Sequence, residues 1–224
     1  MVVFSATSGE PVALLKDEGW LTDMRTGIGG AITTIELAPK NAKNVLLIGT
    51  GLQCRFQADC LSRLSPDIYQ YSVWGRSLRN AKKACEDLSS KGLDIKPATD
   101  LEEGVKKADI IITTTPSTEH IVRNSWVSDS THITAIGADS LGKQELDTDL
   151  LHRADLLVSD LNSQSLDHGE FQSIKETRSA LSPIEIGNIF NKTEGGRLSE
   201  ESVTIADLTG IAPQDIAITG TVLL

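Results

Sequence analysis

The stretch Val45-Leu-Leu-Ile48-Gly49-Thr50-Gly51-Leu52-Gln53-Cys54 decides the fold of this 224-residue chain. Its first four residues form an apolar run typical of a buried strand, and a helical pattern starts at Gln53. Gly49 permits a tight turn, Gly51 lets the backbone approach a ligand, and the small Cys54 lets the helix pack on the strand. Strand, turn and helix in this order predict a site for a dinucleotide pyrophosphate at the helix N-terminus, where N–H groups and the helix dipole favour negative charge.

The alternation of strands and helices continues from this turn to about residue 160. We expect strands over residues 45–48, 69–74, 109–114, 131–137 and 156–160, and helices over 53–64, 78–90 and 147–153, with a further short helix opening at Asp100. This order predicts an α/β fold, a doubly wound Rossmann-type parallel sheet with its ligand beyond the carboxyl ends of the strands. Outside it we expect a hairpin from residues 2–5 and 12–15, a helix over 22–37, a strand over 202–206 and a helix from Pro213.

The composition excludes several functional classes. Aromatic residues make up 4% of the chain and the formal net charge is −10, so nucleic acid is not an expected partner. No apolar run reaches the roughly 20 residues that cross a bilayer, and no leader pattern opens the chain, so we expect no membrane association and a cytoplasmic location. The cysteines Cys54, Cys60 and Cys85 have no metal-ligand spacing, so we expect reduced thiols and no metal.

The end of the second predicted strand indicates which dinucleotide is bound. Trp74-Gly75-Arg76-Ser77 contains no carboxylate for a ribose 2′-hydroxyl, whereas Arg76 can form a bidentate contact with a 2′-phosphate and Ser77 is a further donor. This favours NADP(H) over NAD(H) as the NAD(P) cofactor. The alternative is that Arg76 stacks over the adenine, in which case either cofactor would bind.

Two further strand ends carry polar residues. Thr113-Thr-Thr115-Pro116-Ser117 ends the strand on whose rim the nicotinamide half should lie, and its hydroxyls suit a ribose. Ile136-Gly137-Ala138-Asp139 ends the next strand and is followed by Lys143 and Glu145. Asp139 is therefore a candidate acid/base near the position of hydride transfer; the alternative is an Asx turn or a helix cap.

Taken together, these stretches resemble the ornithine cyclodeaminase/μ-crystallin family of NAD(P)-dependent enzymes. The similarity runs in family order over nearly the whole chain. The matching stretches are Leu21-Thr-Asp-Met-Arg25-Thr26, Leu47-Ile-Gly-Thr-Gly-Leu-Gln53, Ala108-Asp-Ile-Ile-Ile-Thr-Thr-Thr-Pro-Ser117, His132-Ile-Thr-Ala-Ile-Gly-Ala-Asp139, Gly142-Lys-Gln-Glu-Leu-Asp147, His168-Gly-Glu170, Glu185-Ile-Gly187, Gly196-Arg197 and Thr209-Gly-Ile-Ala-Pro-Gln-Asp215.

The resemblance implies roles for particular residues. Asp139 would be the catalytic aspartate, and Arg25 would lie near substrate and cofactor; the alternative for Arg25 is a solvated cation on a helix. The implied cofactor site comprises Gly49, Gly51, Leu52, Gln53, Arg76, Ser77, Thr115, Pro116, Ser117, Ile136, Gly137, Ala138, Lys143 and Thr209.

The resemblance also implies an activity and an organisation. Members transfer a hydride at the amine or imine carbon of a small amino or imino acid, as cyclodeaminases making proline from ornithine, as imine reductases or as alanine dehydrogenases. We expect a nucleotide-binding domain at residues 39–200, with residues 1–38 and 201–224 as remnants of a second substrate and dimerisation domain, and a homodimer in the full-length form.

The family's N-terminal segment, with its catalytic lysine and carboxylate-binding arginine, would precede the Leu21–Arg25 match. This chain starts after that segment and ends within the helix that returns to the second domain. We therefore expect dinucleotide binding with little turnover, so a binding protein without catalysis is the alternative to the enzyme.

Overall fold

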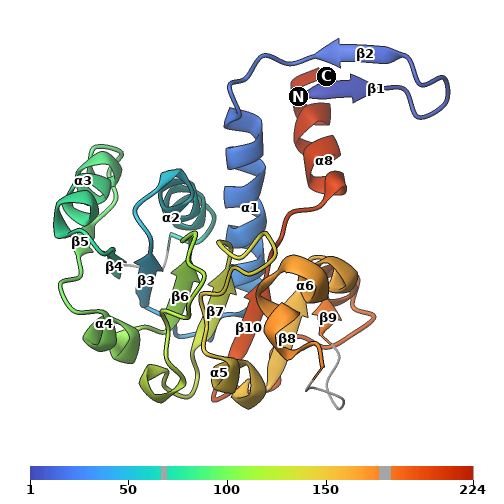
Figure 1. Cartoon of the computed structure of the whole chain (residues 1–224). Helices are drawn as coiled ribbons and strands as arrows, with labels where there is room; N and C mark the ends of the chain where they lie inside the picture. Colours follow the sequence, from blue (N-terminus) through green and yellow to red (C-terminus); the bar gives the residue numbers. More distant parts are fainter. Residues whose placement is uncertain (67–69, 177–182, 224) are drawn as a thin grey trace.

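The computed structural model describes residues 1–66, 70–176 and 183–223 and consists of one large parallel sheet, helices on both its faces, and a small hairpin (Figure 1). The strands are β1 (Val2–Phe4), β2 (Pro11–Leu14), β3 (Asn44–Ile48), β4 (Gln70–Trp74), β5 (Ile95–Pro97), β6 (Ile110–Thr113), β7 (His132–Ala135), β8 (Leu156–Ser159), β9 (Ile184–Glu185) and β10 (Thr204–Asp207). The helices are α1 (Trp20–Leu37), α2 (Leu52–Leu64), α3 (Leu78–Ser89), α4 (Leu101–Lys107), α5 (Thr148–Arg153), α6 (Asn162–His168), α7 (Ile186–Phe190) and α8 (Ala212–Leu223), with 3-10 turns η1 (Asn124–Trp126) and η2 (Glu170–Ile174).

The large sheet has the strand order β5-β4-β3-β6-β7-β10-β8-β9, and all its pairings are parallel. Sequence order reverses on either side of β3, so the chain winds outward in both directions from the first strand of the sheet. All carboxyl ends therefore lie along one edge, where a ligand is expected at the point of reversal. The predicted α/β fold with a doubly wound Rossmann-type sheet is confirmed.

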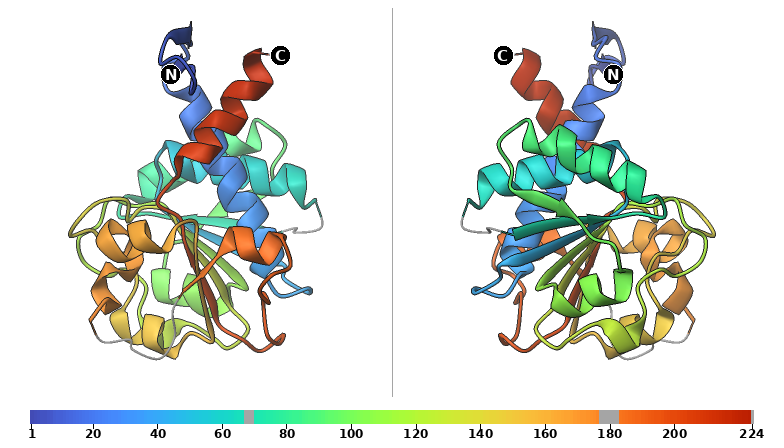
Figure 2. Two further views of the ribbon diagram at one scale, coloured as in Figure 1. Left: turned by 90° about the vertical axis from the view of Figure 1, so that its right-hand side faces the viewer. Right: turned by 90° about the vertical axis from the view of Figure 1, so that its left-hand side faces the viewer.

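Alternate residues of the strands face opposite layers of helices (Figure 2). Val45 and Leu47 of β3 belong to a buried cluster with residues of α1, α2 and α3, whereas Leu46 and Ile48 belong to one with α4, α5 and η2. Because both faces are covered, the central strands are apolar in nearly every position, the pattern of the Val45–Ile48 run. None of the helices in the described part of the chain is long and apolar enough to cross a membrane.

The hairpin and most of the strands and helices occur where the sequence predicts them. The predicted strand over 69–74 is β4, although residue 69 lies outside the described residues. The sequence analysis did not assign β5, a three-residue strand at the edge of the sheet. It predicted the strand over 202–206 without a place for it, and the structure inserts β10 between β7 and β8.

The two ends of the chain lie together, away from the large sheet. Figure 1 shows the β1–β2 hairpin beside the end of α8, and α1 and α8 project from the sheet in the same direction in both views of Figure 2. The Met1 ammonium group donates to the Leu15 carbonyl oxygen at 2.8 Å and pairs with Asp17 at 3.2 Å. The Thr219 hydroxyl of α8 contacts the Met1 sulfur at 3.4 Å.

A chain of polar side chains crosses the core near the amino ends of β7 and β10. His132 is fully buried, with Nδ1 2.8 Å from the Thr204 hydroxyl and Nε2 2.9 Å from the Thr134 hydroxyl. Thr134 in turn contacts the hydroxyl of Thr34 on α1 at 2.7 Å. Burial, aided by the positive charge of Arg197, lowers the pKa of His132 to about 3. The ring is therefore neutral in the folded protein.

This neutral histidine makes stability fall in mild acid. Below pH 6.5 the unfolded chain binds a proton at His132, while the folded state does not until about pH 3. The free energy of unfolding therefore loses up to about 1.4 kcal/mol per pH unit as the pH falls through this window. His132→Gln keeps a donor and an acceptor but cannot titrate, so we expect its stability to fall less steeply in urea unfolding series. His120→Gln, at an exposed histidine, is the control. Parallel curves for parent and His132→Gln would contradict this assignment.

Candidate functional site

The turn from β3 into α2 presents an open helix N-terminus. Gly49 has a φ of 125°, and a Cβ there would collide with Thr114 at the end of β6. Gly51 is the N-cap of α2, and a Cβ built on it meets nothing within 4 Å. No side chain caps this helix. The turn therefore fits a pyrophosphate: glycine is sterically required at Gly49, and the space beside Gly51 is free for the ligand.

Arg55, one turn into α2, fixes the orientation of this loop. Its Nη1 donates to the carbonyl oxygens of Thr50 and Gly51 at 2.7 and 2.9 Å. Its Nε and Nη2 donate to Asp87 of α3 at 2.9 and 2.6 Å. The sequence analysis missed this residue, although an arginine one turn after a glycine-rich turn was a visible signal. Because Arg55 holds the carbonyl groups, it fixes the peptide planes of the turn.

A cleft of about 500 Å³ opens beside the turn, at the carboxyl ends of β3, β4 and β6. It brings together part of the predicted cofactor site, namely Gly49, Gly51, Arg76, Thr115, Pro116 and Ser117. Arg76 is exposed at its wall, with Trp74 and Gly75 beside it. A carboxylate, Glu119, also lines the cleft from the β6 side. The guanidinium at the β4 end is thus accessible to a ligand.

Three predicted cofactor residues lie around the cleft but outside its lining. Leu52 is an exposed side chain at the start of α2. Gln53 donates to Asp23 of α1 at 2.8 Å, and its Oε1 is buried without a hydrogen-bond partner in the described part of the chain. Ser77 caps α3 by accepting from the Asn80 N–H at 3.4 Å. The side chains of Gln53 and Ser77 are therefore already engaged in joining elements.

The end of β7 carries Asp139 and Lys143, whose side chains form an ion pair at 2.5 Å. Asp139 is 54% exposed, so its second oxygen is accessible. Ile136 and Ala138 are buried, and Gly137 packs so closely on the Thr115 backbone that a Cβ there would collide with it. The β6 rim and the β7 rim are thus in direct contact, and Asp139 projects beyond them.

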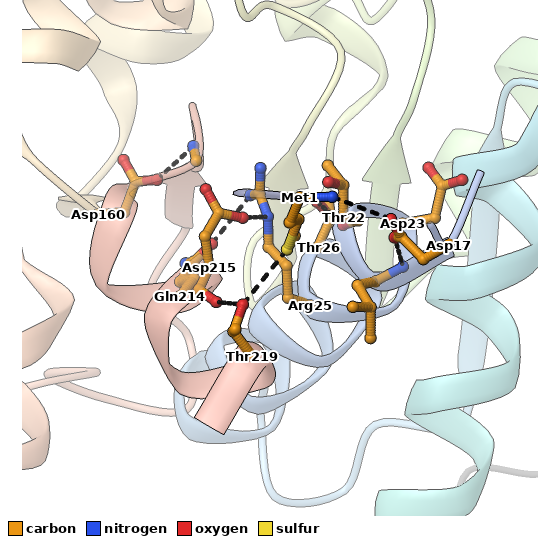
Figure 3. Close-up of polar contacts among 12 residues, drawn as sticks. Met1, Asp17, Thr22, Asp23, Arg25, Thr26, Asp160, Gln214, Asp215 and Thr219 are labelled. Carbon is orange, nitrogen blue, oxygen red and sulfur yellow. Dashed lines mark hydrogen bonds and ion pairs between the residues drawn. The ribbon is translucent and has the colours of Figure 1, made fainter. Parts of the chain in front are cut away.

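Arg25 lies elsewhere, between α1 and α8 (Figure 3). Its Nε pairs with Asp215 and its Nη1 donates to Gln214, both at 3.0 Å. The guanidinium also lies against Gly210, where a Cβ would come within 2.6 Å of Nη1. The structure therefore brings Arg25 to the turn after β10 rather than to the lining of the cleft.

The turn after β10 is anchored by Asp160 at the end of β8. Asp160 accepts from the Gly210 N–H at 2.6 Å and from the Thr209 hydroxyl at 3.0 Å. Gln164 of α6 donates to the same hydroxyl at 2.9 Å. Thr209, predicted to bind cofactor, is thus placed at the sheet's carboxyl edge with its hydroxyl already bonded.

Three buried carboxyl groups lie beneath this edge, and sequence reasoning gave none of them a role. Glu145 accepts from the Thr113 hydroxyl and the Thr115 N–H at 2.6 Å, and from the Gly137 N–H at 2.9 Å. Burial raises its pKa. Glu170 accepts from the main-chain N–H groups of Glu145 and Leu146, and burial together with the Glu145 charge raises its pKa well above the usual range.

The third carboxyl group, Asp207, ends β10. It accepts from the Ser165 hydroxyl and, at 3.4 Å, from the Phe171 N–H, and burial raises its pKa to about 7. Its Oδ1 has no hydrogen-bond partner among the residues that the structure describes. Asp207 therefore joins α6 and η2 to the sheet.

Comparisons with known proteins agree with this geometry. The ornithine cyclodeaminase/mu-crystallin family matches residues 1–223. A solved archaeal alanine dehydrogenase dimer with bound NAD is 34% identical, with a TM-score of 0.90 over 99% of this chain and 68% of that one. The Thermococcus litoralis Δ1-pyrroline-2-carboxylate reductase, solved with NADH and L-proline, is 28% identical, with a TM-score of 0.88 over 98% of this chain and 68% of that one.

A curated relative gives the same result. Ornithine cyclodeaminase of Brucella suis is 31% identical over 219 residues, which cover 96% of this chain and 59% of that protein. The chain thus spans roughly three fifths to two thirds of the length of these relatives. With a family match over almost every residue and the same fold in its solved relatives, the chain belongs to the ornithine cyclodeaminase/mu-crystallin family.

Proposed function

We propose that this chain binds a nicotinamide dinucleotide and belongs to an enzyme that transfers a hydride at the amine or imine carbon of a small amino or imino acid. The observation that carries the proposal is the open N-terminus of α2, which faces a cleft of about 500 Å³ between β3, β4 and β6. NAD and NADH in the two solved relatives support a nicotinamide cofactor.

The residues around the cleft fit the parts of a dinucleotide in order. The pyrophosphate would lie on the turn from Gly49 to Gln53, and the adenosine half would extend toward Arg76 and Ser77. The nicotinamide half would lie toward residues 115–117 and 136–138, with Lys143 and Thr209 beyond. Because Arg76 is exposed and residues 74–77 contain no carboxylate, we favour NADP(H) over NAD(H).

Asp139 is the candidate acid/base. The nicotinamide supplies the hydride or accepts it, and a group beside it must move the proton of the amine or of water. Asp139 offers an accessible carboxylate, and Lys143 holds one of its oxygens at 2.5 Å. Arg25 would bind the substrate carboxylate, for which it must exchange its contacts with Asp215 and Gln214.

Three reactions fit this site: cyclodeamination of ornithine to proline, reduction of a cyclic or open-chain imino acid, and oxidation of an amino acid such as alanine. The named relatives cover all three classes. The dimer of the archaeal relative supports a homodimer for the full-length form. The engaged state of Arg25 favours a second candidate, a chain that binds the dinucleotide without turnover.

Gly51→Val should abolish dinucleotide binding and leave the fold intact. The added side chain meets no protein atom, so it would occupy the space where the pyrophosphate approaches the backbone. Calorimetric titration with NADPH and circular dichroism measure the two effects. Gly220→Val is the matched control, because a Cβ there also meets nothing within 4 Å and the residue lies in α8, outside the cleft lining. Normal affinity in Gly51→Val would rule out this turn as the phosphate site.

Arg76→Ala should narrow the difference between NADPH and NADH affinities. The parent should bind NADPH more tightly, and loss of a charge-assisted contact to the 2′-phosphate should weaken NADPH binding about tenfold or more while changing NADH binding little. Nicotinamide fluorescence titration reports both affinities. The control is Arg79→Ala, an exposed arginine of α3 that does not line the cleft. Equal affinities for the two dinucleotides in the parent would contradict the role of Arg76.

Asp139→Asn should lower hydride transfer by about 10²- to 10⁴-fold, because the amide keeps the shape and cannot move a proton. The assay follows nicotinamide absorbance with ornithine, other amino acids and cyclic imines. Asp129→Asn, at an exposed aspartate in the loop before β7, is the control. An active Asp139→Asn protein would remove Asp139 from the reaction. If the parent binds dinucleotide but reduces or oxidises nothing in the panel, the second candidate is favoured.

A further inference from the structure

Glu145 is bonded to the ends of two neighbouring strands at once. Its Oε1 accepts from the Thr115 N–H on the β6 rim, and its Oε2 accepts from the Gly137 N–H on the β7 rim. The Thr113 hydroxyl donates to Oε2 as well. The side chain is fully buried, so these donors replace its water. One carboxylate therefore fixes the spacing of the two rims.

The main chain of Glu145 is held equally firmly. Its carbonyl oxygen accepts from the N–H groups of Ile121 and Val122 at 2.7 and 3.0 Å. Its own N–H donates to both oxygens of Glu170, at 3.1 and 3.0 Å, and Glu170 is also fully buried. The segment after β6 and the η2 turn are thus joined through the same residue.

No cationic side chain of the described residues forms an ion pair with either carboxyl group. Burying such groups is costly, and an apolar side chain of similar volume would fill the space more cheaply. What the carboxylate supplies is directional contact with two backbone N–H groups that an apolar residue would leave unpaired. The arrangement favours fixed geometry over stability.

We propose that Glu145 is a positioning residue that sets the width of the nicotinamide end of the cleft, and that Glu170 holds Glu145 in place. The proposal rests on the proposed function, because it assigns the Thr115 rim to the ribose and nicotinamide. Gly137 lies two residues before Asp139, so the same carboxylate also fixes where the Asp139 loop leaves the sheet. It acts on the reaction only through these rims.

Glu145→Gln tests the proposal with little change in volume. Whichever way the amide turns, its NH₂ group meets a backbone N–H, either that of Thr115 or that of Gly137, and one rim loses its anchor. In the free protein, amide hydrogen exchange followed by NMR should become about tenfold faster at one of these two N–H groups. Thr113→Val is the matched control, because it removes the hydroxyl donor and keeps both backbone contacts.

Two ligands then separate positioning from general damage. ADP-ribose contains the adenosine and pyrophosphate parts, which the β3 and β4 ends should hold, whereas NADH and NADPH add the nicotinamide. In Glu145→Gln we expect about tenfold weaker dinucleotide binding and ADP-ribose binding within about twofold of the parent. Thr113→Val should lose less in both measurements. Glu170→Gln, which keeps one acceptor oxygen, should show the same pattern more weakly and serves if Glu145→Gln does not fold.

Equal weakening of ADP-ribose and dinucleotide binding would overturn the proposal, since it would show that the change merely loosens the fold. Unchanged exchange at both Thr115 and Gly137 would overturn it too. If the parent binds neither ligand, the proposed function fails. The exchange measurement needs no ligand, so it still decides whether Glu145 anchors the rims.

Discussion

The close approach of β3 to β6 at their carboxyl ends is the constraint on which the site depends. The Ile48 carbonyl oxygen accepts from the N–H and the hydroxyl of Thr114 at 2.8 and 3.2 Å, while the Gly49 N–H donates to Trp74 of β4 at 2.9 Å. The chain leaves β3 pinned on both sides, and only a residue without a Cβ can turn there. The direction of α2 and the opening of the cleft follow from this turn.

Opposite kinds of charge hold the two ends of the sheet. At the amino end Arg197 donates to main-chain carbonyl oxygens, at 2.7 Å to those of both Ser130 and Ser202. At the carboxyl end Glu145 and Glu170 accept from main-chain N–H groups. In each case a charged side chain pairs backbone groups that lie outside the sheet's own hydrogen bonds, which keeps buried loop backbone satisfied. The acidic end is the one that borders the cleft, so rigidity and site share the same residues.

The elements outside the sheet are joined to it through its central strands rather than its edges. β10, between β7 and β8, leads directly into the turn held by Asp160 and from there into α8. Arg25 then ties α8 to α1, and Gln53 ties α1 to α2 at the start of the glycine turn. A continuous set of polar contacts therefore runs from the projecting helices to the phosphate site. Movement of α8 would be felt at Arg25 and at the neighbouring turn.

The sequence by itself determined the elements and the phosphate turn, because apolar periodicity and the spacing of Gly49 and Gly51 are local signals. It gave β3 to within one residue and placed Arg76, Thr115 and Asp139 at strand ends. The tertiary structure alone decided which strand pairs with which, including β5 at an edge and β10 inside the sheet. It also decided that Arg25 contacts Asp215 and that Glu145 joins two rims. Strand pairing and buried polar contacts are fixed by packing between residues distant in the chain, for which a single sequence carries no periodic signal.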